Sequence, residues 1–192
     1  NEELLRQREG LMDAIASDAQ VPPRTVANFV EVLKDTLLAH ELSPFTKGKK
    51  RKVHSRSKLY LFDVGVANAM AERLPIQIKT ASAGKAFEHW MIQEVRAHQS
   101  YSGLDERLTY WRTSSQHEVD LIVSDRIAIE IKFTENVTDR HLKSLRVLKE
   151  ELPNTKSIVV SNENATRRTS DGIRILPWKT FLSELWSGGL NP

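Results

Sequence analysis

Three residues that could act together chemically lie close in sequence in the second half of the chain: Asp120, Glu130 and Lys132. Between residues 119 and 132 aliphatic side chains recur with a period of two, which predicts two β-strands. Because successive strand side chains point to opposite faces, Glu130 and Lys132 share a face. Asp120 joins them if it pairs opposite Glu130, which requires residues 124–126 to form a three-residue loop or a nearby bulge.

The pairing of two acids on one face predicts a metal site. Asp120 and Glu130 would repel each other and be poorly hydrated, because Ile122 and Ala128 flank them, unless a cation lies between them. Mg²⁺ or Mn²⁺, which accept oxygen ligands, would meet that need. Lys132 could then orient an attacking water or neutralise a phosphoryl oxygen. The alternative is that Glu130 and Lys132 are solvent-facing charges of an amphipathic strand.

The elements that must position these residues follow from the surrounding periodicity. The opposite face of the two strands is expected to be wholly aliphatic, with Val119, Leu121 and Val123 side by side. In chain order the pattern predicts a helix over 83–98, strands over 107–112, 117–123 and 127–134, a helix over 138–152 and a strand over 156–161.

An additional acid is expected on the first of these helices. Glu88 lies at helical spacing from Met91, Ile92 and Val95, so it should share their core-facing side. No basic residue near it in sequence is an obvious partner. We therefore expect Glu88 to point toward the two strand acids and to take part in the metal site.

The sequence Asp120, then Glu130-Ile131-Lys132, resembles the D…(D/E)-x-K signature of the PD-(D/E)XK nuclease superfamily. That superfamily has an α-β-β-β-α-β fold, which is the element order predicted here, and an acid on its first helix, which Glu88 matches. The resemblance implies a mixed α+β (α/β) chain whose residues 73–192 form a restriction-endonuclease-like domain. It further implies that Glu88, Asp120 and Glu130 hold the metal ion and that Lys132 completes the catalytic set.

Before this domain, the chain predicts two helices joined by a tight turn. An apolar stripe ends at residues 18–20, and Pro22-Pro23 opens a second helix. Four apolar side chains are expected to line one face of that helix, namely Val26, Phe29, Val30 and Leu33. The layout resembles a helix-turn-helix, with Gln20 where that motif usually has glycine. The alternative is a helical hairpin used only for packing.

A β-hairpin is expected next, with a strand over 37–45, a turn over 46–50 and a return strand over 53–62. Together with the helices it implies a winged helix-turn-helix domain over residues 1–72. Residues 44–60 contain seven Lys and Arg and no acid; the net charge is only +3, so the rest of the chain is net acidic.

Such a local concentration of positive charge favours a local anionic partner, with nucleic acid, and DNA in particular, as the first choice. The residues expected to contact it are Arg24, Thr25, Asn28, Lys47, Lys49, Lys50, Arg51 and Lys52. Alternatively, the lysines contact another domain or keep an exposed hairpin soluble.

The order of all these segments is similar to the C-terminal half of prokaryotic AAA-type ATPases that carry a winged helix and then a nuclease-like domain of unknown function. The recurring marks are Tyr60-Leu61-Phe62-Asp63-x-Gly65, Phe87-Glu88, Glu118-Val119-Asp120 and Glu130-Ile131-Lys132. The resemblance implies an ATPase domain in the parent chain. The 192 residues themselves contain no G-x-x-x-x-G-K-[ST] phosphate-binding loop.

Composition narrows the functional classes. The chain has no cysteine, and its six histidines form no pair at zinc-ligand spacing, so a zinc site is not expected. It has no apolar run of membrane-spanning length and no secretory signal, so we expect a cytoplasmic protein without a membrane partner. Two functions remain: a metal-dependent nuclease, which the joint presence of all four polar site residues favours, or a non-catalytic DNA- or protein-binding regulatory module of an AAA-type ATPase.

Overall fold

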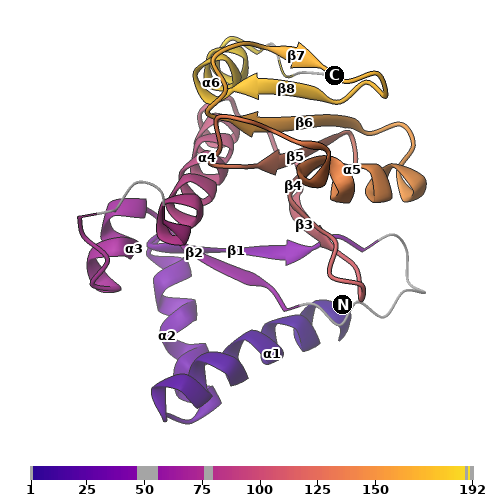
Figure 1. The fold of residues 1–192 in the computed structure, drawn as a ribbon. Helices are drawn as coiled ribbons and strands as arrows, with labels where there is room; N and C mark the ends of the chain where they lie inside the picture. Colours follow the sequence, from indigo (N-terminus) through magenta and orange to yellow (C-terminus); the bar gives the residue numbers. More distant parts are fainter. Residues whose placement is uncertain (1, 47–55, 76–79, 189, 191–192) are drawn as a thin grey trace.

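The computed structural model describes residues 2–46, 56–75, 80–188 and 190 (Figure 1). These residues form a mixed α and β fold with six helices and one eight-stranded sheet. The helices are α1 (Glu2–Ala19), α2 (Pro23–Asp35), α3 (Val64–Met70), α4 (Ala81–Tyr101), α5 (Asp139–Glu151) and α6 (Trp178–Trp186). The strands are β1 (Ala39–Pro44), β2 (Lys58–Leu61), β3 (Leu108–Arg112), β4 (Glu118–Val123), β5 (Ile127–Ile131), β6 (Lys156–Ser161), β7 (Arg167–Arg168) and β8 (Arg174–Pro177).

The strand order is β2-β1-β3-β4-β5-β6-β8-β7. β3, β4 and β5 form an antiparallel meander, whereas β5, β6 and β8 run parallel, with α5 connecting β5 to β6. The predicted order α-β-β-β-α-β is therefore confirmed from α4 to β6, with boundaries that differ by a few residues. The further strands β7 and β8 and helix α6 extend the fold beyond the predicted elements.

The hairpin of β1 and β2 continues this sheet. β1 pairs in parallel with β3, where Ser43 lies opposite Thr109 and Pro44 opposite Tyr110. The Phe45 amide also donates a hydrogen bond to the Tyr110 carbonyl oxygen at 2.6 Å. The segment expected to form the wing thus shares main-chain hydrogen bonds with the segment expected to form the nuclease-like domain.

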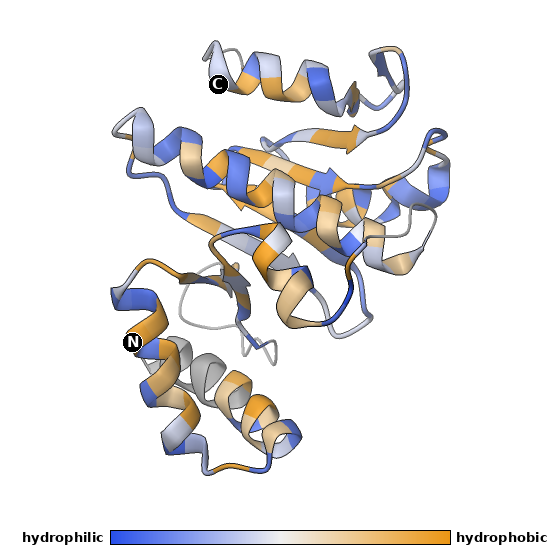
Figure 2. Cartoon of the chain, turned by 90° about the vertical axis from the view of Figure 1, so that its left-hand side faces the viewer, coloured by the Kyte–Doolittle hydropathy of each residue, from blue (hydrophilic) through white to orange (hydrophobic). Residues whose placement is uncertain are grey.

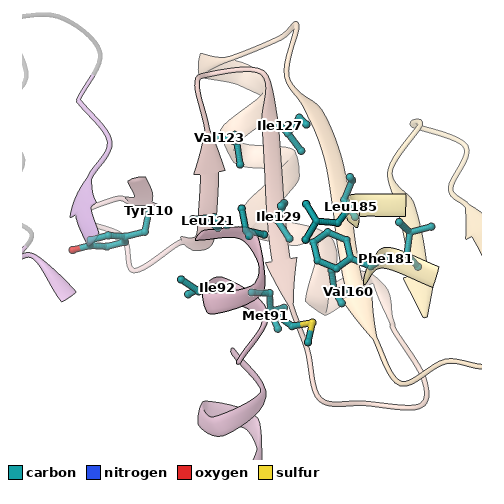
Figure 3. Close-up of a cluster of buried hydrophobic side chains, with 14 of the residues drawn as sticks. Met91, Ile92, Tyr110, Leu121, Val123, Ile127, Ile129, Val160, Phe181 and Leu185 are labelled. Atoms are coloured by element: carbon teal, nitrogen blue, oxygen red, sulfur yellow. The ribbon is translucent and has the colours of Figure 1, made fainter. Parts of the chain in front are cut away.

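Helices cover both faces of the sheet, so its central strands are buried on both sides. On one face α4 and α6 pack on aliphatic residues of β4 to β6; Figure 3 shows Leu121 and Ile129 side by side within this cluster, near Met91 and Phe181. On the other face three leucines of α5 pack on the sheet: Leu142, Leu145 and Leu148. In Figure 2 the central strands are largely orange, the colour of hydrophobic residues.

The N-terminal helices have a small core of their own. Met12 and Ala16 of α1 pack against Val26 and Val30 of α2. The turn between the helices places Gln20 at a φ of 55°, the left-handed conformation in which glycine is the usual residue. The prediction that Phe29 faces this core is wrong, since its side chain is 67% exposed. Val26 and Val30 are buried in the cluster with α1, whereas Phe29 is not a member of it.

No helix among the described residues is both long enough and apolar enough to cross a bilayer.

Candidate active site

The β4–β5 hairpin has the register that the sequence predicted. Leu121 pairs with Ile129 and Val123 with Ile127, so the same register brings Asp120 level with Glu130. The connecting residues 124–126 form a three-residue loop, in which Ser124 and Asp125 adopt positive φ values of 46° and 60°. The predicted juxtaposition of the two acids therefore follows from strand pairing.

A β-bulge next to Asp120 corrects one expectation. The β3–β4 register shifts between Thr109 and Trp111, so the regular alternation of β4 is broken near Asp120. As a result Val119 packs among the buried residues on the face covered by α5, while Leu121 packs among those on the face covered by α4 and α6. The prediction that these two residues share one face is wrong because the bulge inserts a residue between them.

The bulge also gives Asp120 a main-chain partner. Its Oδ2 atom accepts a hydrogen bond from the Ile131 amide at 2.7 Å. A side-chain oxygen of β4 thus takes a donor at the end of β5, just beyond the last paired residues of the hairpin. This bond fixes the Asp120 carboxylate at the position where Glu130 and Lys132 emerge.

Lys132 lies between the two acids. Its Nζ atom is 2.6 Å from Glu130 Oε1 and 3.7 Å from Asp120 Oδ2. Asp120 and Glu130 are only 5% and 3% exposed, whereas the Lys132 side chain is 34% exposed. The alternative, that the charged residues of these strands face solvent, does not apply to Asp120 and Glu130, because both acids are buried.

The electrostatics of the group are set by burial. Desolvation raises the pKa of Glu130, and the neighbouring Asp120 raises it further. Desolvation also raises the pKa of Asp120, against the opposing charge of Lys132. Burial alone would lower the pKa of the Lys132 ammonium, but the two carboxylates raise it, so Lys132 is held as a cation.

Glu130 leaves one buried oxygen unsatisfied. Its Oε2 atom has no hydrogen-bond partner among the described residues. A buried carboxylate oxygen without a donor is costly, and a divalent cation coordinated there would remove that cost. The donor set of Asp120 and Glu130 consists of carboxylate oxygens, which fits Mg²⁺ or Mn²⁺. The described part of the chain contains no group of three or more His, Cys, Asp or Glu side chains arranged to hold a metal.

Glu88 is held by side chains of β2, a strand that no pattern in the sequence places next to Glu88. Tyr60 donates a hydrogen bond to Glu88 Oε1 at 2.9 Å, and Lys58 Nζ lies 3.2 Å from the same atom. The expectation that Glu88 has no basic partner holds only for its sequence neighbours, because β2 supplies Lys58. Glu88 is still close enough to Asp120 for its charge to raise the pKa of that carboxyl.

Lys58 is a functional candidate that sequence reasoning missed, because it was counted as one of the charges of residues 44–60. Its ammonium also lies 2.7 Å from Glu118 Oε1 and 4.9 Å from the centre of the Tyr110 ring. Burial would lower the pKa of Lys58, but Glu88 and Glu118 raise it. The alternation of Lys58 and Tyr60 indicates a shared strand face, but no local pattern indicates that this face meets α4.

We expect Lys58 and Glu88 to be energetically coupled. Both side chains are 25% exposed, so water screens their ion pair only in part. A double-mutant cycle with Lys58→Met, Glu88→Gln and the double variant should give a coupling free energy of about 1–2 kcal/mol in urea unfolding. The exposed pair Arg146–Asp139 is the control and should give a smaller coupling. A Lys58–Glu88 coupling near zero would contradict the observed contact.

The residues predicted to contact nucleic acid fall into two groups. Arg24 and Asn28 are exposed and Thr25 is half-buried at the start of α2, where they are accessible as expected. The basic residues Lys47, Lys49, Lys50, Arg51 and Lys52 lie outside the described residues.

Comparison with known sequences matches two parts of the chain. Residues 83–181, which contain all four predicted catalytic positions, match a family described as "Domain of unknown function (DUF4143)". Domains of this family are found at the C-termini of AAA-type ATPases. Residues 11–77 match a second family, described as "Domain of unknown function (DUF8612)". No curated protein and no solved structure matches the chain.

Proposed function

The chain belongs to the family described as a domain of unknown function (DUF4143), and from this premise we propose that its C-terminal region is a metal-dependent nuclease of the PD-(D/E)XK type. One observation carries the proposal. The buried acids Asp120 and Glu130 converge around Lys132, and Glu130 Oε2 is left without a partner among the described residues. Buried acids with perturbed pKa values are more typical of functional sites than of surface strands.

Each residue has a distinct role in the proposed site. Asp120 and Glu130 would hold Mg²⁺ or Mn²⁺, which when bound supplies Lewis-acid activation of a phosphodiester and of a water molecule. Lys132, whose ammonium is kept protonated by the acids, stabilises negative charge on the phosphoryl oxygens and orients the attacking water. Glu88, positioned by Lys58 and Tyr60, adds a third carboxylate near Asp120.

The N-terminal part of the chain would bind the nucleic-acid substrate. We propose that it is a winged helix-turn-helix in which the start of α2 and the basic segment 47–52 contact DNA, and that the parent protein carries an ATPase domain. The exposed positions of Arg24 and Asn28 support this role. A cytoplasmic location follows from the same proposal, because the DNA of prokaryotic cells lies there.

A second candidate function is a binding module that does no chemistry. It is favoured by the engagement of Glu88, whose Oε1 atom already contacts Lys58 and Tyr60. In that case the acids and lysines form an internal ionic network that stabilises the junction of β2, α4 and β4. The two functions differ in whether a divalent ion binds at Asp120 and Glu130.

A cleavage assay tests the proposal directly. The purified protein is incubated with single-stranded, duplex and branched DNA and with RNA, each with Mg²⁺, Mn²⁺ or EDTA. The proposal predicts cleavage of at least one substrate in the presence of a metal and none with EDTA. Absence of cleavage in every combination, together with no metal-dependent rise in melting temperature, would favour the binding module.

We also expect DNA binding to depend steeply on salt concentration. Each phosphate contact contributes roughly 0.9 to the slope of log K against log salt, because counterions are released. The variant Lys49→Ala/Lys50→Ala/Arg51→Ala should flatten the slope by about three if all three residues contact phosphates. Fluorescence anisotropy over a salt series measures this slope. The exposed cations Arg140 and Lys143 provide the control, and their replacement by alanine should leave it unchanged. An unchanged slope in the triple variant would assign the basic segment to another role.

A further inference from the structure

A cavity of about 340 Å³ lies at the opposite end of β5 from Glu130 and Lys132. The first residues of three parallel strands line it, namely Ile127 of β5, Lys156 of β6 and Arg174 of β8. Strand register brings Lys156 level with Ile127, and Arg168 of β7 level with Arg174. Lys149, near the end of α5, completes the basic part of the wall.

The charges of this cavity are one-sided. Four Lys and Arg line it, and no Asp or Glu of the described residues does. The side chains of Lys156 and Arg168 are exposed, and neither makes a hydrogen bond or ion pair with the described part of the chain. Lys149 donates to the Asp171 carbonyl oxygen at 2.9 Å, which leaves its charge uncompensated. Arg174 is held by Glu184 at 2.7 and 2.9 Å from outside the lining.

This grouping is not a consequence of a generally basic surface. Outside residues 44–60 the chain is net acidic, so acids are numerous enough to pair with cations. Nearby arginines do find acids: Arg146 contacts Asp139 and Asp171, and Arg167 contacts Glu163. Cations gathered in a concave site without acids repel each other, and an anion bound between them would relieve that repulsion.

We propose that this cavity binds a small organic phosphate. Lys156, Arg168 and Lys149 hold the phosphate groups, because guanidinium and ammonium donors are the strongest phosphate partners among side chains. Pro153, which is exposed in the wall, offers an apolar surface for the organic part of the ligand. The volume falls in the range of roughly 300–1,000 Å³ that is usual for small-molecule sites, which favours a compact ligand over a nucleic-acid strand.

The proposal goes beyond the nuclease function and is independent of it. The cavity lies at the N-terminal ends of β5, β6 and β8, whereas the acids lie where β5 ends. Binding there requires neither the divalent ion nor Asp120. The test can therefore be made in EDTA, where the proposed nuclease site has no metal.

Isothermal titration calorimetry with inorganic pyrophosphate as the probe tests the site in the whole chain at low ionic strength. We expect saturable one-to-one binding to the wild type. The variant Lys156→Ala/Arg168→Ala should bind at least about tenfold more weakly, since it loses two charge-assisted contacts. The control Arg140→Ala/Lys143→Ala removes the same two residue types from exposed positions of α5 outside the cavity and should bind as the wild type does. Lys156 and Arg168 are exposed, so folding should survive, and equal melting temperatures of the two variants verify this.

Competition experiments distinguish which class of phosphate compound binds in the cavity. Displacement of pyrophosphate by ADP, with weaker displacement by AMP, supports a small organic polyphosphate as the ligand. The proposal is overturned if pyrophosphate binds equally well to Lys156→Ala/Arg168→Ala, or if no saturation occurs below about 10 mM. It is also overturned if only a 5′-phosphorylated oligonucleotide binds through these residues, because the surface would then be a nucleic-acid contact.

Discussion

Replacing Asp120 with Asn should reduce metal-dependent DNA cleavage by at least about a hundredfold to a thousandfold while leaving DNA binding nearly unchanged. Asparagine keeps the shape of the side chain and can still accept a hydrogen bond from the Ile131 amide, which now lies 2.7 Å from Asp120 Oδ2. It removes the negative charge that a divalent ion requires. Binding should persist because it depends on basic residues of the N-terminal part.

The matched control is Asp125→Asn. Asp125 lies in the loop of the same hairpin, is exposed, and has a φ of 60°, a conformation that asparagine tolerates well. The chemical change is therefore identical, but no proposed metal ligand is altered. Single-turnover cleavage assays should show wild-type activity for Asp125→Asn. Equal activities of Asp120→Asn and the wild type would exclude Asp120 as a metal ligand.

Lys132→Ala should also abolish cleavage, but for a different reason. The ammonium contacts both acids, at 2.6 and 3.7 Å, so its loss removes a charge that would stabilise the transition state. It should leave metal binding intact or strengthen it, because a competing cation is gone. Manganese titration followed by melting temperature therefore separates the two variants: Asp120→Asn loses the metal response, and Lys132→Ala keeps it.

The hairpin at the centre of the site could be predicted from sequence because its determinants are local. A period of two on both arms and a three-residue loop suffice to place Asp120 level with Glu130. The bulge beside Asp120 could not be predicted, since it depends on the pairing of β4 with β3. The shift in this pairing buries Val119 on the face covered by α5, and no pattern in the sequence indicates that Val119 is buried on that face.

The environment of Glu88 depends on contacts between distant segments. Lys58 and Tyr60 precede it by 30 and 28 residues and reach it only because β2 lies at the edge of the same sheet. Parallel pairing of β1 with β3 brings that edge into place, and nothing in the periodicity of either strand specifies its partner. Helix and strand identity are local properties, whereas partner choice across the sheet is not.

Replacing Glu130 with Gln should stabilise the metal-free protein at alkaline pH, with a smaller effect at acid pH. Burial and Asp120 raise the pKa of Glu130 above its ordinary value of 4.5, so the folded state binds this proton more tightly than the unfolded state. The contribution of Glu130 to the free energy of unfolding is then largest at low pH. It is lost as the pH rises from the ordinary pKa of this group toward its raised pKa. Glutamine cannot ionise, so the variant avoids this loss. We expect its free energy of unfolding to exceed that of the wild type by on the order of 1–3 kcal/mol at a pH of about 8.

Urea unfolding of both proteins in EDTA, at pH values of about 5 and about 8, measures the effect. Other groups also titrate, and burial lowers the pKa of His40 to about 3, which gives a loss of stability as pH falls. That contribution is common to the wild type and Glu130→Gln and cancels in their difference. The control Glu135→Gln makes the same chemical change at an exposed acid a few residues away and should not reproduce the gain in stability seen with Glu130→Gln.

Addition of Mg²⁺ should reverse the order of stabilities. An ion that binds only the folded state stabilises it by RT ln(1 + [L]/Kd), which is about 2.7 kcal/mol at a concentration of 100 Kd. The wild type should gain this free energy because the Glu130 carboxylate, including its unpartnered Oε2 atom, becomes a ligand. Glu130→Gln should gain little, because it lacks the charge. If Mg²⁺ stabilises neither protein and the metal-free pH dependence is still observed, Glu130 is a buried structural acid held by Lys132, and the binding module becomes the better description of this domain.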